Sequence, residues 1–163
     1  MNQKICCSEE NLNDLHKSTG WIPCREQTHP IDEILNVKEK MNAQNKKLYY
    51  SKEDEILINY FGYESILLIS KDQFKLKSSV SLNVEKKIIC IPNEYPYQVP
   101  YGTFHYVLWY SYLDIDKSKI NEDIFQCLKE INEEKKFEFV WYENPSMSVP
   151  EVYHVQVFWH YLE

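Results

Sequence analysis

The sequence contains almost no arginine. Of its 18 basic residues only Arg25 is an arginine, and the formal net charge is −7. Proteins that hold DNA or RNA through the phosphate backbone need a basic face, and arginine is the side chain best suited to that contact. The composition therefore disfavours generic nucleic-acid binding. The composition is still compatible with binding of a small anionic ligand, because backbone N–H groups and a few lysines can hold one phosphate.

Paired cysteines and long apolar runs are missing as well. The five cysteines are odd in number and none forms a C-x-x-C pair, so we expect neither a disulfide framework nor a cysteine zinc site. No stretch approaches the roughly 20 apolar residues that a bilayer span needs. The start MNQKICCSEENLNDL has no apolar signal run, and neither end carries a lipidation motif. We therefore expect a cytoplasmic or nuclear protein in a reducing compartment, neither secreted nor bound to a membrane.

Helix-forming patterns fill residues 1–62 of a chain whose 163 residues fit a single domain. Thr28 and Pro30 mark the start of an amphipathic helix, with Pro30 in its first turn, and we expect this helix to lie on a sheet. Ser51 is the expected N-cap of a second helix, which Gly62 ends as a left-handed C-cap.

The pattern becomes extended in residues 63–163. Short alternating or β-branched runs predict strands at YESILLIS, DQFKLKSS, VEKKIICIP, FHYVLWYS, KFEFVWYE and VYHVQVFWHYL. One amphipathic helix, with Asp116 or Ser118 as its candidate cap, separates the last two of these from the rest. Its expected apolar face is Ile120, Ile124, Cys127, Leu128 and Ile131. The sequence therefore predicts an α+β fold in which helices pack on an antiparallel sheet.

The last predicted strand has two unlike faces. Alternate residues share a face, so Val155, Val157 and Trp159 form an apolar side, while His154 and Gln156 align on the other. The same rule places His105 with Trp109 on one face of FHYVLWYS. If the two strands are neighbours, His105 and His154 line one pocket. The alternative is that each histidine is only a solvated or singly hydrogen-bonded strand residue.

A metal site built from the strand histidines is not expected. His154 and His160 lie six residues apart on one strand, which is roughly 20 Å at about 3.3 Å per residue, too far to share an ion. His105 and His154 alone leave a metal short of ligands. No metal and no cofactor is therefore predicted. Most of the thirteen tyrosines and four tryptophans are expected in the core or at an interface.

Two segments resemble known families. "NEYPYQVPYGTFHYVLWYS" and "FVWYENPSMSVPEVYHVQVFW" resemble an uncharacterised family of fungi and some viruses, whose fungal members are known as N-acetylglucosamine-induced proteins. The same segments are similar to the histidine-triad superfamily of nucleotide hydrolases and transferases. The resemblance covers about the last 75 residues, and it implies a histidine-triad-like core within residues 63–163.

The resemblance implies roles for individual residues. His154 falls on the superfamily's nucleophilic histidine, and Gln156 falls on a position that hydrogen-bonds a phosphate oxygen. The remaining implied ligand-binding residues are Asn144, Ser146, Ser148, His105 and Trp109. Val152 stands where the superfamily has its first histidine, and Met147 stands where it has a glycine.

Two functions follow from these features. The first is a histidine-triad-like domain that binds a nucleotide, nucleotide sugar or sugar phosphate, with His154 serving a nucleotidyl hydrolase or transferase reaction. The second is a non-catalytic interaction or assembly module that keeps the fold without the chemistry, with a protein partner or a second copy of the chain against its aromatic surface.

Overall fold

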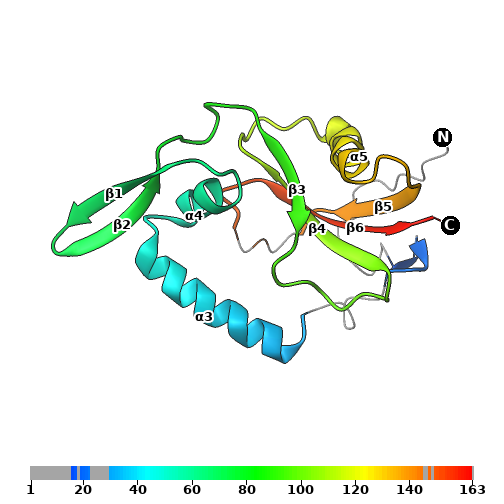
Figure 1. The fold of residues 1–163 in the computed structure, drawn as a ribbon, viewed down its shortest axis with the longest axis horizontal. Coiled ribbons are helices and arrows are strands. Elements are labelled where there is room, and N and C mark those ends of the chain that lie inside the picture. The colour runs from blue at the N-terminus through cyan, green and yellow to red at the C-terminus, as the bar shows by residue number, and fades with distance from the viewer. Residues whose placement is uncertain (1–15, 18, 23–29, 145–146, 148, 163) are drawn as a thin grey trace.

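The computed structural model describes residues 16–17, 19–22, 30–144, 147 and 149–162 (Figure 1). These residues form a single α+β domain, which confirms the predicted fold class. No helix in these ranges is long and apolar enough to cross a membrane. The elements follow one another as α3 (Asp32–Leu48), α4 (Lys52–Asn59), β1 (Ser65–Ser70), β2 (Gln73–Ser78), β3 (Ile88–Pro92), β4 (Thr103–Tyr110), a 3-10 turn (Lys117–Lys119), α5 (Ile120–Ile131), β5 (Phe137–Tyr142) and β6 (His154–Tyr161).

The main sheet places the two histidine-bearing strands side by side. Its antiparallel order is β3-β4-β6-β5, so β4 and β6 are direct neighbours. Trp109 lies opposite His154, and His105 lies opposite Phe158. Directly opposed residues of an antiparallel pair share a face of the sheet. His105 and His154 therefore lie on the same face, as the alternation predicts, but four positions apart.

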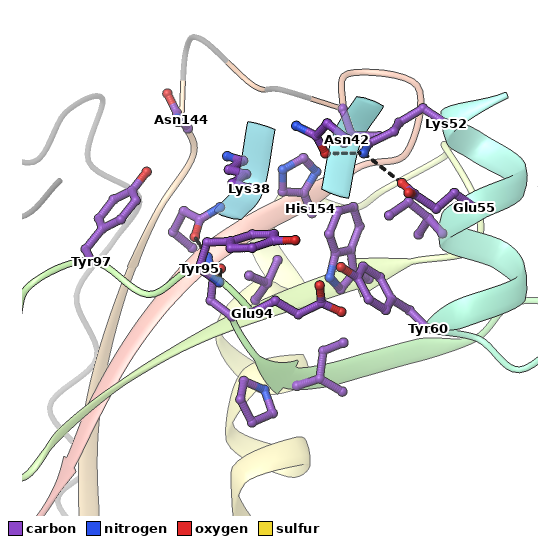
Figure 2. Close-up of a pocket in the computed structure, with 18 residues that line it drawn as sticks. Lys38, Asn42, Lys52, Glu55, Tyr60, Glu94, Tyr95, Tyr97, Asn144 and His154 are labelled. Atoms are coloured by element: carbon purple, nitrogen blue, oxygen red, sulfur yellow. Dashed lines mark hydrogen bonds and ion pairs between the residues drawn. The ribbon is translucent and has the colours of Figure 1, made fainter. Parts of the chain in front are cut away.

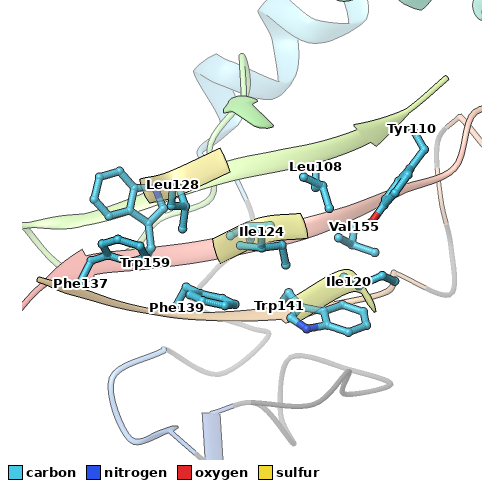
Figure 3. Packing of buried hydrophobic residues seen from close by; sticks show 11 residues of the cluster. Leu108, Tyr110, Ile120, Ile124, Leu128, Phe137, Phe139, Trp141, Val155 and Trp159 are labelled. Carbon is cyan, nitrogen blue, oxygen red and sulfur yellow. The ribbon is translucent and has the colours of Figure 1, made fainter. Parts of the chain in front are cut away.

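Helix α5 covers the other face of this sheet (Figure 3). The predicted apolar side of β6, Val155, Val157 and Trp159, is fully buried there. Three residues of the expected face of α5, Ile120, Ile124 and Leu128, are fully buried, and Cys127 packs beside them. Ile131, expected on the same face, is 51% exposed at the end of the helix. The central members of this cluster are Leu108, Tyr110, Ile120, Ile124, Leu128, Phe137, Phe139, Trp141, Val155, Val157 and Trp159.

The histidine-bearing face is covered by two separate apolar clusters. Ile56 and Leu57 of α4 pack with Val107 and Trp109 at one end of β4. Ile22 packs with Val140, Tyr142 and Phe158 at the other end. Between these clusters the face carries buried polar side chains, and the candidate site lies there.

Strands β1 and β2 do not join the main sheet. They form a two-stranded hairpin of their own, which extends from the body of the domain (Figure 1). Lys71 and Asp72 both have positive φ, of 48° and 64°, as a two-residue type I′ turn requires. Ile69 and Phe74, opposed across the hairpin, are 68% and 59% exposed. Both strands are confirmed, and the expectation that one sheet holds every strand is wrong.

The two helices before the hairpin differ in how well the sequence predicts them. The Ser51 side chain accepts a hydrogen bond from the Asp54 N–H at 3.1 Å, so the predicted N-cap of α4 is confirmed. Gly62 has the predicted left-handed φ, +75°, but the helix ends earlier, at Asn59, and its C-cap is Tyr60. Helix α3 begins at Asp32, so Pro30 precedes it instead of lying in its first turn. The predicted cap Thr28 lies outside the described residues. No residue of α3 is buried, and the helix lies across a cavity from the main sheet.

Candidate functional site

A cavity of about 210 Å³ opens on the histidine-bearing face of the main sheet (Figure 2). We call it the His154 cavity. Its floor consists of Val107, Trp109, His154 and Gln156 from β4 and β6. Its walls include Lys38 and Asn42 of α3, Lys52, Glu55 and Ile56 of α4, Tyr60 directly after α4, Asn93, Glu94, Tyr95 and Tyr97 of the loop after β3, and Asn144 and Val149 of the loop before β6.

His154 is held in a single ring orientation. Its Nδ1 lies 2.9 Å from the carbonyl oxygen of Val152, and a carbonyl can only accept, so Nδ1 carries the proton. The imidazole stacks on Trp109 with ring centroids 4.2 Å apart. Burial lowers the pKa of His154, and the Val152 carbonyl only partly opposes this effect. The ring is therefore neutral near pH 7, and Nε2 is its unprotonated nitrogen.

Gln156 is positioned by a network behind the cavity. The Tyr97 N–H donates to Nδ1 of His105 at 3.0 Å, so the His105 proton lies on Nε2. That Nε2–H donates to Oε1 of Gln156 at 2.6 Å, and the Asn93 amide donates to the same oxygen at 3.3 Å. The oxygen of Gln156 is held on this side, and none of the hydrogen bonds found among the described residues uses its NH₂ group, which leaves that group for a ligand in the cavity.

The walls of the cavity carry charges of both signs. Lys52 donates to Asn42 at 3.1 Å and forms an ion pair with Glu55 at 2.7 Å (Figure 2). Burial, and then the nearby charge of Lys52, lower the pKa of Lys38. Burial and the carboxylate of Glu94 raise the pKa of Tyr60, so this phenol stays protonated. Lys38 is therefore the cation best placed to meet an anion, because Lys52 is already paired.

The structure brings four of the predicted site residues together. His154, Gln156, Trp109 and Asn144 all line the His154 cavity. His105 does not line it: both ring nitrogens are used within the network, and the side chain is 5% exposed. The distance along the strands from His105 to His154 is roughly 13 Å, at about 3.3 Å per residue. His105 thus reaches the cavity through Gln156.

The other predicted positions lie elsewhere. Ser146 and Ser148 are outside the described residues. His160, on the same face of β6, hydrogen-bonds Glu138 at 2.5 Å, and its ring lies tilted against Trp21, with centroids 4.2 Å apart, at the far end of the strand. Among the residues that the structure describes, no three His, Cys, Asp or Glu side chains are grouped as a metal ion would need.

Comparison with known proteins adds little to this geometry. No protein-family model matches the chain. No curated protein matches it either. The chain is similar to a solved structure, the crystal structure of HTC1, with a TM-score of 0.45 and 10% sequence identity over 92% of this chain and 83% of that chain.

Several cavity residues have no signal in the sequence. Lys38, Lys52 and Glu55 lie on α3 and α4, and Tyr60 directly follows α4. The spacing of these helices indicates only packing faces, and the four residues reach the site through long-range folding. Asn93 is different, since it follows strand β3 directly within the Pro-rich segment PNEYPYQVPYG. Polar residues in loops at strand ends often belong to binding or catalytic sites, so the sequence could have indicated Asn93 as a site residue.

The buried His105 predicts a specific dependence of stability on pH. Burial lowers its pKa to about 4, against about 6.5 for an exposed imidazole. Between these values the unfolded chain binds a proton that the folded chain does not, so the free energy of unfolding falls as the pH falls. We expect a loss of up to roughly 3 kcal/mol from pH 6.5 to pH 4.

Urea denaturation at a series of pH values measures this loss. The His105→Asn variant should show a flatter dependence on pH, even if it is less stable throughout. An NMR titration in which the His105 imidazole is protonated near pH 6.5 in the folded protein would contradict the assignment.

Proposed function

We propose that this protein binds a small phosphate ester in the His154 cavity and transfers its phosphoryl or nucleotidyl group through His154. The proposal depends on one observation: Nδ1 of His154 donates to the Val152 carbonyl, which leaves the Nε2 lone pair for attack. A neutral imidazole is a competent nucleophile toward phosphorus, and a covalent intermediate divides one difficult displacement into two easier steps.

The proposed reaction has two balanced steps. In the first, the Nε2 lone pair of His154 forms a bond to phosphorus while the bond from phosphorus to the leaving oxygen breaks, and the leaving group takes that electron pair and a proton from water. In the second, a water molecule attacks the phosphorus and gives one proton to the hydroxide that the first step left in the solvent, the P–N bond breaks, and the imidazole recovers its lone pair. An alcohol or phosphate acceptor in place of water would make the same chemistry a transfer.

In this proposal Gln156 and Lys38 stabilise the negative charge of the phosphate. The NH₂ group of Gln156 would donate to a non-bridging phosphate oxygen, where negative charge develops in the transition state. Lys38 would add a positive charge from the opposite wall. Val152 contributes only its carbonyl, so no histidine side chain stands at that position to protonate the leaving group, and solvent would have to do so.

The cavity volume limits the part of the ligand that it can enclose. At about 210 Å³, it is smaller than the roughly 300–1,000 Å³ of typical ligand pockets. A sugar phosphate, or the phosphate end of a nucleotide or nucleotide sugar, matches this size. Tyr95, Tyr97 and Trp109 add aromatic walls against which a sugar or base can pack.

Thermal unfolding in the presence of phosphate ligands tests the binding step. A ligand at 100 times its Kd adds about 2.7 kcal/mol of stability, which raises the Tm of a domain of this size by roughly 5–10 °C. The probes are inorganic phosphate, glucose 1-phosphate, adenosine 5′-monophosphate and UDP-glucose. We expect at least one organic phosphate to produce such a shift.

Two lysines of α3 provide a matched pair of variants. Lys38 lines the cavity, whereas Lys40, on the same helix, is exposed outside it. Lys38→Met should weaken binding about tenfold, as loss of a charge-assisted contact does, while Lys40→Met should leave binding unchanged. If no phosphate ligand shifts the Tm of the unaltered protein, the proposal is wrong.

The second candidate function is a non-catalytic assembly module. The exposed apolar side chains of the β1–β2 hairpin favour it, since Ile66, Leu67, Ile69 and Phe74 are each about half exposed or more. In this alternative the hairpin contacts a second copy of the chain. A solution mass above the monomer that Phe74→Lys returns to the monomer, together with no phosphate binding, would favour this function over the first.

A further inference from the structure

A second cavity, of about 510 Å³, adjoins the His154 cavity. It lies among α3, α4 and strand β2, and we call it the lysine cavity. Asn42, Lys52 and Glu55 line both cavities, so these three hydrogen-bonded and ion-paired residues lie between them. A ligand seated at His154 can therefore extend past this group into a larger space.

The lysine cavity is cationic. Lys46, Lys52 and Lys75 line it, and Glu55 is the single acidic residue among the described residues around it. Glu55 is already paired with Lys52, so its charge is neutralised. Lys75 donates to the Lys46 carbonyl at 2.8 Å, and among the described residues neither lysine has a carboxylate within ion-pair distance. In a chain of net charge −7, two lysines without an acidic partner at one cavity favour an anionic occupant.

Glu55 supplies an independent indication of the ligand. It is 6% exposed, and its buried Oε1 has no hydrogen-bond partner among the residues that the structure describes, although Oε2 is paired with Lys52. A buried acceptor left unsatisfied costs about 1–3 kcal/mol, so native structures normally provide it with a donor. A ligand hydroxyl at the boundary of the two cavities is such a donor, once the side chains that cover Oε1 move aside for it.

We infer that the two cavities are subsites of one groove, and that the ligand is a sugar or nucleoside bisphosphate. Its reacting phosphate lies at His154, a sugar hydroxyl donates to Glu55, and its second phosphate lies between Lys46 and Lys75. This inference rests on the proposed function, because it extends the same ligand. It also accounts for a His154 cavity too small for a whole nucleotide.

Calorimetric titration with pairs of probes tests this inference. Glucose 1-phosphate is compared with glucose 1,6-bisphosphate, and adenosine 5′-monophosphate with adenosine 3′,5′-bisphosphate. In at least one pair, the bisphosphate should bind about tenfold tighter or more, as an additional charge-assisted contact provides. The double variant Lys46→Met/Lys75→Met should reduce this preference to about threefold or less, and it should leave the monophosphate affinity unchanged.

Lys71→Met provides the control, because Lys71 lies in the exposed turn of the hairpin, outside both cavities. This variant should keep the full preference for the bisphosphate. Equal affinity for both members of each pair, or a preference that survives the double variant, would overturn the inference and leave the proposed function intact. Failure of every probe to bind would overturn the proposed function, and the inference with it.

Discussion

Replacing His154 by glycine should reduce turnover of a phosphodiester by about 10³-fold or more, as loss of a covalent nucleophile does. The probe is the p-nitrophenyl ester of thymidine 5′-monophosphate, whose leaving group needs no acid catalyst. The reason is geometric: Nδ1 is engaged by the Val152 carbonyl, so Nε2 is the only ring nitrogen of His154 that can attack. In the unaltered protein, intact-mass spectrometry should detect the covalent nucleotidyl adduct.

Added imidazole should distinguish a chemical role of His154 from a structural one. Glycine leaves a space beside the Trp109 ring, which His154 normally stacks on at 4.2 Å, and free imidazole can enter that space and attack in its place. Partial rescue of turnover by imidazole is therefore expected. His160→Gly is the matched control, since it makes the same change on β6 at a residue bonded to Glu138 outside the cavity. Equal turnover in the unaltered protein and in His154→Gly would exclude His154 as the nucleophile.

The pH profile of this turnover follows from the same residue. Attack requires the neutral imidazole, and burial lowers the pKa of His154 below its ordinary value of about 6.5. The rate should therefore stay level as the pH is lowered through 6.5, and it should fall only as the pH passes through the lowered pKa. A rate that falls with a midpoint at or above pH 6.5 would indicate an exposed, ordinary histidine.

The elements of the fold could be predicted because their signals are local. Alternation along β4 and β6 places His105 and His154 on one face. The Ser51 hydroxyl caps the first turn of α4, and Gly62 adopts the left-handed conformation that a residue without a Cβ permits. The pairing of strands is less local. The β1–β2 hairpin is closed by its own tight turn, and nothing in its alternation indicates whether it joins the main sheet or forms a separate one.

The candidate site was only partly predictable, for the same physical reason. His154 and Gln156 share a strand, so a period of two reveals them. Lys38 and Glu55 reach the cavity only because α3 and α4 fold over the sheet, and no short-range pattern encodes that approach. The role of His105 was also hidden, since the acceptor of its Nε2–H is on a different strand, 51 residues away along the chain.

The largest stability effect is expected at Phe139, in the middle of the edge strand β5. This side chain is fully buried in the cluster under α5, and it lies opposite Trp159 of β6 (Figure 3). Phe139→Ala should lower the free energy of unfolding by about 3–5 kcal/mol. The substitution deletes a buried ring with its packing contacts, and it leaves a cavity that the sheet can only partly close. Urea denaturation measures the change.

Phe74 is the matched control, because it is the same residue type on a strand but is 59% exposed on the hairpin. Phe74→Ala should change the free energy of unfolding by no more than about 0.5 kcal/mol. A cost below about 1 kcal/mol for Phe139→Ala would mean that β5 is not packed under α5.

The floor of the His154 cavity depends on this packing, since β6 is held between β4 and β5 and its apolar side faces α5. Loss of the β5 contact should therefore weaken ligand binding at His154 as well as folding.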